Sequence, residues 1–165
     1  MSIQSIVEVL TTMTQLHDSL FTVSKNKTEA LKQGNMEQLQ DLLVQERKHV
    51  KAINQLEVKR IEMINKWSES QGLDNDSITV SVMLDNYLQG VEKESLEKVT
   101  TVLAETLLQL KQQEELNKQL TQQSLQFIQL SMDMIAPTIK NINYGNKTEN
   151  RADQITKRSV FDSKA

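Results

Sequence analysis

The chain lacks cysteine and has little proline, glycine or aromatic residue. Its 165 residues include no Cys, one Pro and four Gly, and aromatic residues make up 4%. Without cysteine there is no disulfide framework and no thiolate for a zinc ion or for nucleophilic catalysis. So few aromatic residues supply little bulk for a compact globular core. Many Leu, Gln, Glu and Lys residues are typical of elongated helices. We therefore expect an all-α protein without a cofactor.

Long apolar runs are also absent. No window approaches the roughly 20 apolar residues that a membrane span needs. The first residues, Met-Ser-Ile-Gln-Ser-Ile-Val-Glu, contain no basic stretch followed by an apolar segment, so they do not look like a signal peptide. The sequence therefore predicts a protein of the cytoplasm with no direct membrane insertion.

Charge is distributed unevenly along the chain. The net charge is −3, but residues 137–165 hold six Lys or Arg against three Asp or Glu, which is +3 and leaves −6 for residues 1–136. An acidic body with a mildly basic end is a poor nucleic-acid binder, so we expect no nucleic-acid partner. The basic end is typical of a solvated, flexible tail.

Apolar spacing predicts two long helices at the start of the chain, over about 2–33 and 36–71. Apolar side chains recur there every three or four residues, as on one stripe of a helix. Gly34 is expected to end the first helix, and Asn35 to cap the second with Gln38 as its capping partner. Because the break between them is so short, the two helices should fold back as an antiparallel hairpin.

Two further helices are predicted, over about 78–89 and 91–135. A strand over the first of these is conceivable from its Val and Thr content, but a single strand would have no partner. Pro137 is expected to end the last helix. The predicted organisation is an elongated antiparallel hairpin plus a third long helix, a coiled-coil-like bundle over 1–136, with a flexible basic tail over 137–165.

The apolar stripe of the last long helix is interrupted. Between Lys111 and Gln123 it thins to two leucines among Gln and Glu, and Asn117 falls where an apolar residue is expected. The stripe recovers from Leu125 onward, in a stretch that also contains Met132 and Met134, and methionines suit an adaptable binding surface. A half-polar stripe packs weakly, so this half of the helix is predicted to be open to a partner.

Candidate catalytic or metal-binding residues are few. Glu46 and His49 form the Glu-x-x-His spacing of di-iron bundles, but that site needs the motif twice, and the other histidine, His17, has Thr14 in place of the glutamate. A weak adventitious site between the two histidines is the minor alternative. Trp67 and Phe127 lie on apolar stripes, and this placement favours the core over a binding platform for both. We therefore predict that the protein is not an enzyme.

The chain resembles the FlgN family of flagellar type III export chaperones over essentially its whole length. The resemblance rests on the helix order, Lys-Gln-Gly-Asn-Met-Glu-Gln-Leu at 32–39 followed by Glu46-Arg47, Glu-Leu-Asn at 115–117 leading to Ser-Leu-Gln-Phe-Ile at 124–128, Pro137, Tyr144-Gly145, and the closing Phe-Asp-Ser-Lys-Ala at 161–165. No one of these motifs is specific alone, and the combination carries the resemblance.

The resemblance implies a function and a set of partners. FlgN chaperones bind the C-terminal helices of the hook–filament junction proteins FlgK and FlgL, prevent their premature assembly and deliver them to the export gate. The cargo-binding positions that it implies here are Leu110, Asn117, Leu120, Ser124, Phe127 and Ile128. Members can carry a second Asn where this chain has Leu120. Tyr144 matches the tail tyrosine that docks on the cytoplasmic domain of the gate protein FlhA.

Other interpretations stay open from the residues alone. A generic coiled-coil interaction or tethering protein would share the stripes, although it would be expected to continue its seam without a polar gap. A metal-bundle enzyme would need ligands that the sequence does not supply. An uncovered helix face also favours self-association, so a homodimer is an alternative state of the free protein.

Overall fold

The computed structural model describes residues 2–73 and 78–161, and the side chains among them as far as Ala136. The described residues form four helices and no strand, which confirms the all-α class. The chain divides into two compact units, Met1–Leu120 and Thr121–Ala165. Each unit is described by itself below.

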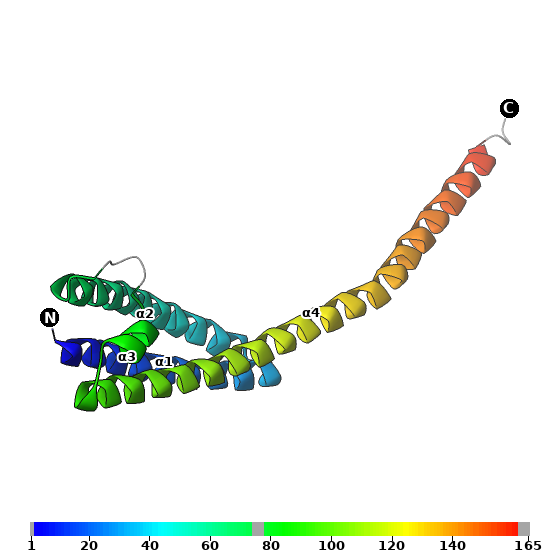
Figure 1. Ribbon diagram of the computed structural model, residues 1–165. Helices are drawn as coiled ribbons and strands as arrows, with labels where there is room; N and C mark the ends of the chain where they lie inside the picture. The colour runs from blue at the N-terminus through cyan, green and yellow to red at the C-terminus, as the bar shows by residue number, and fades with distance from the viewer. Residues whose placement is uncertain (1, 74–77, 162–165) are drawn as a thin grey trace. The chain divides into compact units, whose positions relative to one another are not determined.

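Helices α1 (Ile3–Gln33) and α2 (Met36–Ser70) form an antiparallel hairpin (Figure 1). Gly34 ends α1 with a left-handed backbone, φ 66°, and its N–H reaches the carbonyl of Leu31 at 3.3 Å. The Asn35 side chain then accepts a hydrogen bond from the N–H of Gln38 at 3.1 Å, which caps α2. Two adjacent residues thus end one helix and begin the next, as the sequence predicts.

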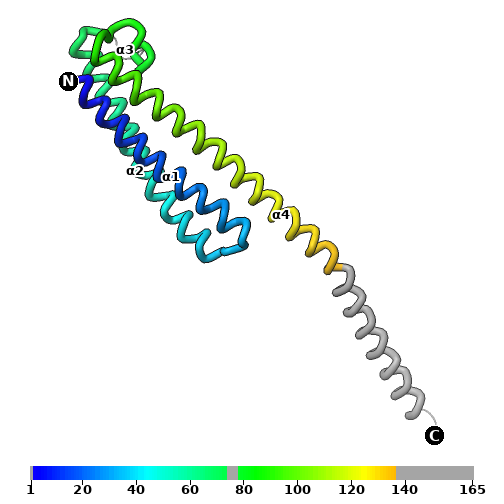
Figure 2. The backbone as a smooth tube through the Cα atoms, turned by 90° about the horizontal axis from the view of Figure 1, so that it is seen from below, coloured from blue at the N-terminus to red at the C-terminus, as the bar shows by residue number. Residues whose placement is uncertain are grey.

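A short helix, α3 (Val80–Asn86), closes one end of the bundle, and the long helix α4 (Gly90–Phe161) follows it. The Thr79 side chain caps α3 by accepting from the N–H of Val82 at 3.3 Å. The ribbon and the backbone tube both show the first part of α4 running beside α1, with the N-terminus near α3 (Figures 1 and 2). Because Val80–Asn86 form the helix α3, the alternative of a strand over about 78–89 is wrong.

The main core lies where α3 meets the other three helices. Met83 of α3 and Leu96 of α4 are fully buried, against Ile6 of α1 and Ile64 of α2. Trp67 is 5% exposed and meets Tyr87 edge to face, with ring centroids 6.1 Å apart. The expected place of Trp67 in the core is confirmed, whereas the same expectation for Phe127 is wrong, because Phe127 is 71% exposed.

The C-terminal limit of α4 differs from the expected end at Ile135. The helix continues to Phe161, beyond Pro137. A proline inside a helix removes one backbone hydrogen bond, but it does not prevent helical backbone on both sides of it. The prediction that Pro137 ends the last helix is therefore wrong, and it made the predicted helix too short. The division into a chaperone domain and a flexible tail over 137–165 stays a prediction.

Candidate partner-binding site

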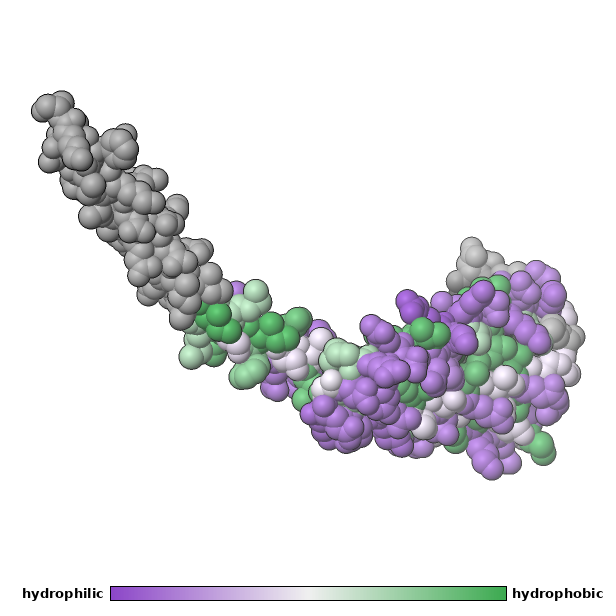
Figure 3. Space-filling model, turned by 180° about the vertical axis from the view of Figure 1, so that it is seen from behind, coloured by the Kyte–Doolittle hydropathy of each residue, from purple (hydrophilic) through white to green (hydrophobic). Residues whose placement is uncertain are grey.

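An uncovered apolar segment of α4 lies in the second unit, between Leu125 and Ile135. Its large apolar side chains are between 53% and 71% exposed. They are Leu125, Phe127, Ile128, Leu130, Met132, Met134 and Ile135. Figure 3 shows them as a group of hydrophobic residues next to the atoms drawn in grey. A helix ordinarily buries such side chains. This segment therefore has the apolar composition of a buried helix, but its side chains are exposed.

The apolar side chains of this segment surround the helix rather than forming one stripe. At 100° per residue, Leu125, Ile128 and Met132 fall on one face. Phe127, Leu130 and Met134 fall on the opposite face. Helices that are apolar all round occur in interiors, with neighbours on more than one side. Apolar side chains of this segment are therefore exposed on two faces of α4.

The structure separates the six predicted cargo-binding residues into two groups. Leu110 and Asn117 are buried in the first unit, at 9% and 3% exposure. Leu120 is half-buried, and Ser124, Phe127 and Ile128 are exposed on successive turns of α4. Tyr144 belongs to the part of α4 whose side chains lie outside the described residues.

A polar cluster joins three helices at the end of the first unit, and we call it the polar junction. Its members are Ser24, Lys27 and Thr28 of α1, Glu46 of α2, and Gln113, Glu114 and Asn117 of α4. Asn117 donates to the Ser24 carbonyl at 2.9 Å and accepts from the Thr28 hydroxyl at 2.5 Å. These bonds form only when α4 lies in this register on α1, so the polar junction specifies that register.

Asn117 corrects the expectation of a weakly packed stripe. Leu96, Leu103, Leu110 and Asn117 follow one another at intervals of seven, and all four are buried. The buried seam therefore continues through Asn117. Its side-chain amide forms hydrogen bonds with Ser24 and Thr28 of α1, which apolar neighbours could not provide. The uncovered part of α4 begins later than the sequence indicates, after Leu120.

We expect Asn117→Ala to lower the free energy of unfolding by about 1–3 kcal/mol, since it leaves buried groups of Ser24 and Thr28 with fewer partners. Urea unfolding followed by circular dichroism measures this. Ser124→Ala, an exposed polar change seven residues on, is the control and should stay within about 0.5 kcal/mol. Equal stability of Asn117→Ala and wild type would show that the polar junction does not stabilise the bundle.

Lys27 is the cation of the polar junction and pairs with two of its carboxylates. Its Nζ lies 2.6 Å from Glu46 Oε1 and 3.1 Å from Glu114 Oε2, and its side chain is 9% exposed. Burial by itself would lower the pKa of Lys27, but the hydrogen bonds that it donates to Glu46 and Glu114, together with their charges, outweigh burial and raise the pKa above its ordinary value of 10.5.

A pH dependence follows from this raised pKa. The contribution of Lys27 to stability is complete below pH 10.5 and is lost as the pH rises through its higher folded pKa. We expect Lys27→Gln to cost roughly 1–3 kcal/mol near neutral pH, less than for a fully buried pair because Glu114 is partly exposed. The difference in free energy of unfolding between Lys27→Gln and wild type, measured by urea unfolding, should become smaller above about pH 10.5.

Lys32 provides the control for this pH series. It pairs with Glu29 at 2.9 Å, but its side chain is 53% exposed. Lys32→Gln should therefore stay within about 0.5 kcal/mol of wild type throughout. If the difference in free energy of unfolding between Lys27→Gln and wild type were the same at every pH, the effect could not be assigned to the charge of Lys27.

The two histidines form hydrogen bonds within the helical hairpin. His17 Nδ1 lies 2.7 Å from the Met13 carbonyl, and His49 Nε2 lies 2.8 Å from Ser19 Oγ. Within residues 2–73 and 78–136 no group of three or more His, Asp or Glu side chains is placed to hold a metal ion. Among the described helices none is long and apolar enough to cross a membrane.

The predicted cargo-binding residues did not include Leu125, Leu130 and Ile135. Leu125 and Ile135 were predicted to lie on the recovering stripe but were not counted as contacts, whereas Leu130 lies on the opposite face. Counting apolar residues around the whole circumference of α4 would have found Leu130.

The fold and the site define a helical binding protein that leaves apolar helix surface available to another protein. The chain belongs to the FlgN family: the sequence model of that family, described as "FlgN protein", matches residues 1–152. A curated relative from Bacillus subtilis (strain 168), "Uncharacterized protein YvyG", is 37% identical over 165 residues, which is all of both chains. No solved structure matches. Family membership gives the protein the general role of a flagellar export chaperone.

Proposed function

We propose that this protein binds the C-terminal helices of FlgK and FlgL in the cytoplasm, prevents their premature assembly and delivers them to the export gate. The uncovered apolar segment of α4 between Leu125 and Ile135 is the observation that carries the proposal. Cargo helices would cover it by laying their own apolar faces along α4, in the helix-in-groove mode of recognition.

The six positions implied by the resemblance take different roles in this proposal. Phe127 and Ile128 contact the cargo, with Leu120 and Ser124 at the edge of the contact. Leu110 and Asn117 act as positioning residues, because both are buried in the bundle and Asn117 sets the register of α4.

Calorimetric titration with purified FlgK and FlgL tests the proposal. We expect one-to-one binding to each protein. Binding should bury apolar surface and order side chains on both partners, so its heat capacity change should be negative. Titrations without detectable binding to either protein, repeated by analytical ultracentrifugation, would overturn the proposal and leave the general chaperone role without these partners.

A further inference from the structure

Two methionines lie within the uncovered apolar segment of α4. Met132 is 62% exposed and Met134 is 71% exposed. Met132 follows Ile128 by one helical turn, and Met134 follows Leu130 by one turn, so each methionine belongs to a different apolar face. A partner that covers either face would therefore cover a thioether.

The other described methionines differ in burial or in position. Met13 and Met83 are buried in the main core, at 5% and 0% exposure, and Met63 packs partly buried against it. Met36 is 58% exposed, but it is the first residue of α2 and belongs to the first unit. Three described methionines are therefore accessible in the folded protein, and two of them lie in the apolar segment.

Methionine is the sulfur-containing residue of this chain, because the chain has no cysteine. A hydroperoxide converts an accessible methionine into its sulfoxide. The sulfur lone pair attacks one peroxide oxygen, and the O–O bond breaks as the S–O bond forms. The departing hydroxide takes the proton of the new S–OH group and leaves as water. Sulfur loses two electrons in this step, and the peroxide gains them.

A sulfoxide in the apolar segment would act on binding rather than on folding. At an exposed position its oxygen stays hydrated, so the free protein keeps its helices. Under a cargo helix the same oxygen would lose its water without gaining a hydrogen-bond donor, which costs binding free energy. From Gln119 to Met132 the chain has no Asp, Glu, Lys or Arg, so no charge in this stretch offsets that cost.

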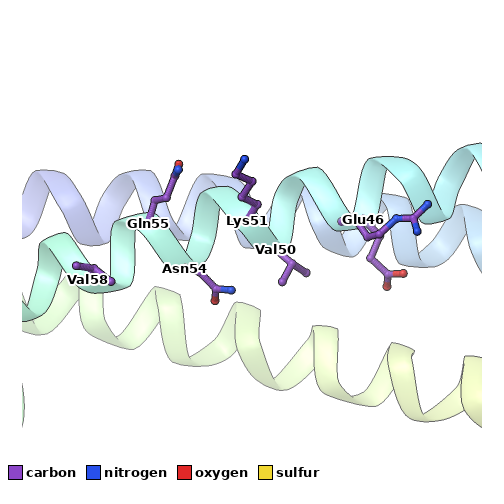
Figure 4. Close-up of a pocket in the computed structure, with 7 residues that line it drawn as sticks. Glu46, Val50, Lys51, Asn54, Gln55 and Val58 are labelled. Carbon is purple, nitrogen blue, oxygen red and sulfur yellow. The ribbon is translucent and has the colours of Figure 1, made fainter.

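An exposed surface of the first unit provides a comparison. A hollow of about 620 Å³ along α2 has Val50 and Val58 among its lining residues, and none of the described residues lining it is a methionine. Figure 4 shows Val50 and Asn54 pointing toward the side on which α4 lies. Peroxide has no thioether to oxidise there, whereas the apolar segment of α4 presents two.

We propose that Met132 and Met134 are sites of reversible oxidation by hydroperoxides, and that their sulfoxides prevent cargo binding. The inference rests on the proposed function, in which the Leu125–Ile135 segment binds cargo. Methionine sulfoxide reductases, which reduce sulfoxides back to thioethers, restore binding. Bound cargo covers both sulfur atoms, so the free chaperone is the form that reacts.

The test treats the full-length protein with hydrogen peroxide, removes the oxidant with catalase, and titrates the product with untreated FlgK in a calorimeter. Peptide mass spectrometry should find oxidation at Met36, Met132 and Met134 but not at Met13 or Met83. We expect the Kd for FlgK to rise at least about tenfold, and to return after treatment with the two sulfoxide reductases MsrA and MsrB.

Leucine variants assign the effect to the apolar segment. Met132→Leu combined with Met134→Leu keeps apolar side chains of similar volume but removes both thioethers. Its Kd after peroxide is compared with its own Kd before peroxide, and we expect a change of less than about twofold. Met36→Leu is the matched control, and its Kd should rise on oxidation as much as that of wild type.

Protection by cargo gives an independent measurement. With peroxide in excess, we expect saturating FlgK to slow oxidation of Met132 and Met134 at least about fivefold, because cargo would bury both sulfur atoms. Oxidation of Met36 in the same sample should keep its rate, so Met36 serves as the internal standard. Equal rates at Met132 and Met134 with and without FlgK would contradict the inference.

The titrations separate failure of this inference from failure of the proposed function. Untreated wild type that does not bind FlgK would overturn the proposed function and this inference with it. Untreated protein that binds, and binds equally well with Met132 and Met134 oxidised, would overturn this inference alone. Equal weakening in the oxidised double leucine variant would do the same, as would loss of the helical circular dichroism signal on oxidation.

Discussion

Ile128→Asp is expected to weaken binding of FlgK and FlgL by at least about 2 kcal/mol, roughly a thirtyfold increase in Kd. Ile128 is 53% exposed in the free protein and shares a face of α4 with Leu125 and Met132. A cargo helix laid on that face would surround it with apolar groups, so an aspartate there would lose apolar contact and have its carboxylate desolvated. Isothermal titration calorimetry measures the change.

Leu108→Asp is the matched control for this experiment. Leu108 is 57% exposed and lies on the same helix, but in the first unit. The two variants carry the same charge and remove side chains of the same size at nearly the same exposure. We expect Leu108→Asp to bind cargo as wild type does. Similar losses in both variants would show that added negative charge on α4, rather than the Leu125–Ile135 surface, explains the effect.

The hairpin could be predicted from sequence because its determinants are local. Gly34 and Asn35 are neighbours, and each acts on a helix end within four residues of itself. Likewise the spacing of Leu96, Leu103 and Leu110 along one helix predicts that they are buried. Signals of this kind need no knowledge of which element packs on which.

The polar junction could not be predicted in the same way. Asn117 finds its partners at Ser24 and Thr28, about ninety residues earlier in the chain. Nothing on α4 alone shows that these side chains stand opposite the amide. A polar residue in an apolar seam therefore indicates a gap or a satisfied network equally well, and only the packing of α1 on α4 distinguishes them.

The exposure of only some candidate cargo-binding residues could be predicted from the sequence. Phe127 and Ile128 fall inside the uncovered segment, whereas Leu110 and Asn117 fall inside the bundle.

Tyr144→Ala is expected to abolish binding to the cytoplasmic domain of FlhA and to leave FlgK binding unchanged. The expectation rests on the likeness of Tyr144-Gly145 to the tail tyrosine of FlgN chaperones. A tyrosine ring supplies a large, rigid apolar body with a polar hydroxyl, so its loss removes most of a small contact. Titrations of full-length protein with each partner measure the two effects separately.

Two variants make this result specific. Tyr87→Ala removes a tyrosine that is 45% exposed in the first unit, and we expect it to bind FlhA as wild type does. Tyr144→Phe keeps the ring, so partial binding would assign the remainder of the contact to the hydroxyl. Loss of both FlhA and FlgK binding in Tyr144→Ala would refute the division of labour between α4 residues 125–135 and Tyr144. If instead only FlhA binding is lost, cargo capture and gate docking are independent, and a chaperone can reach the gate with its cargo still bound.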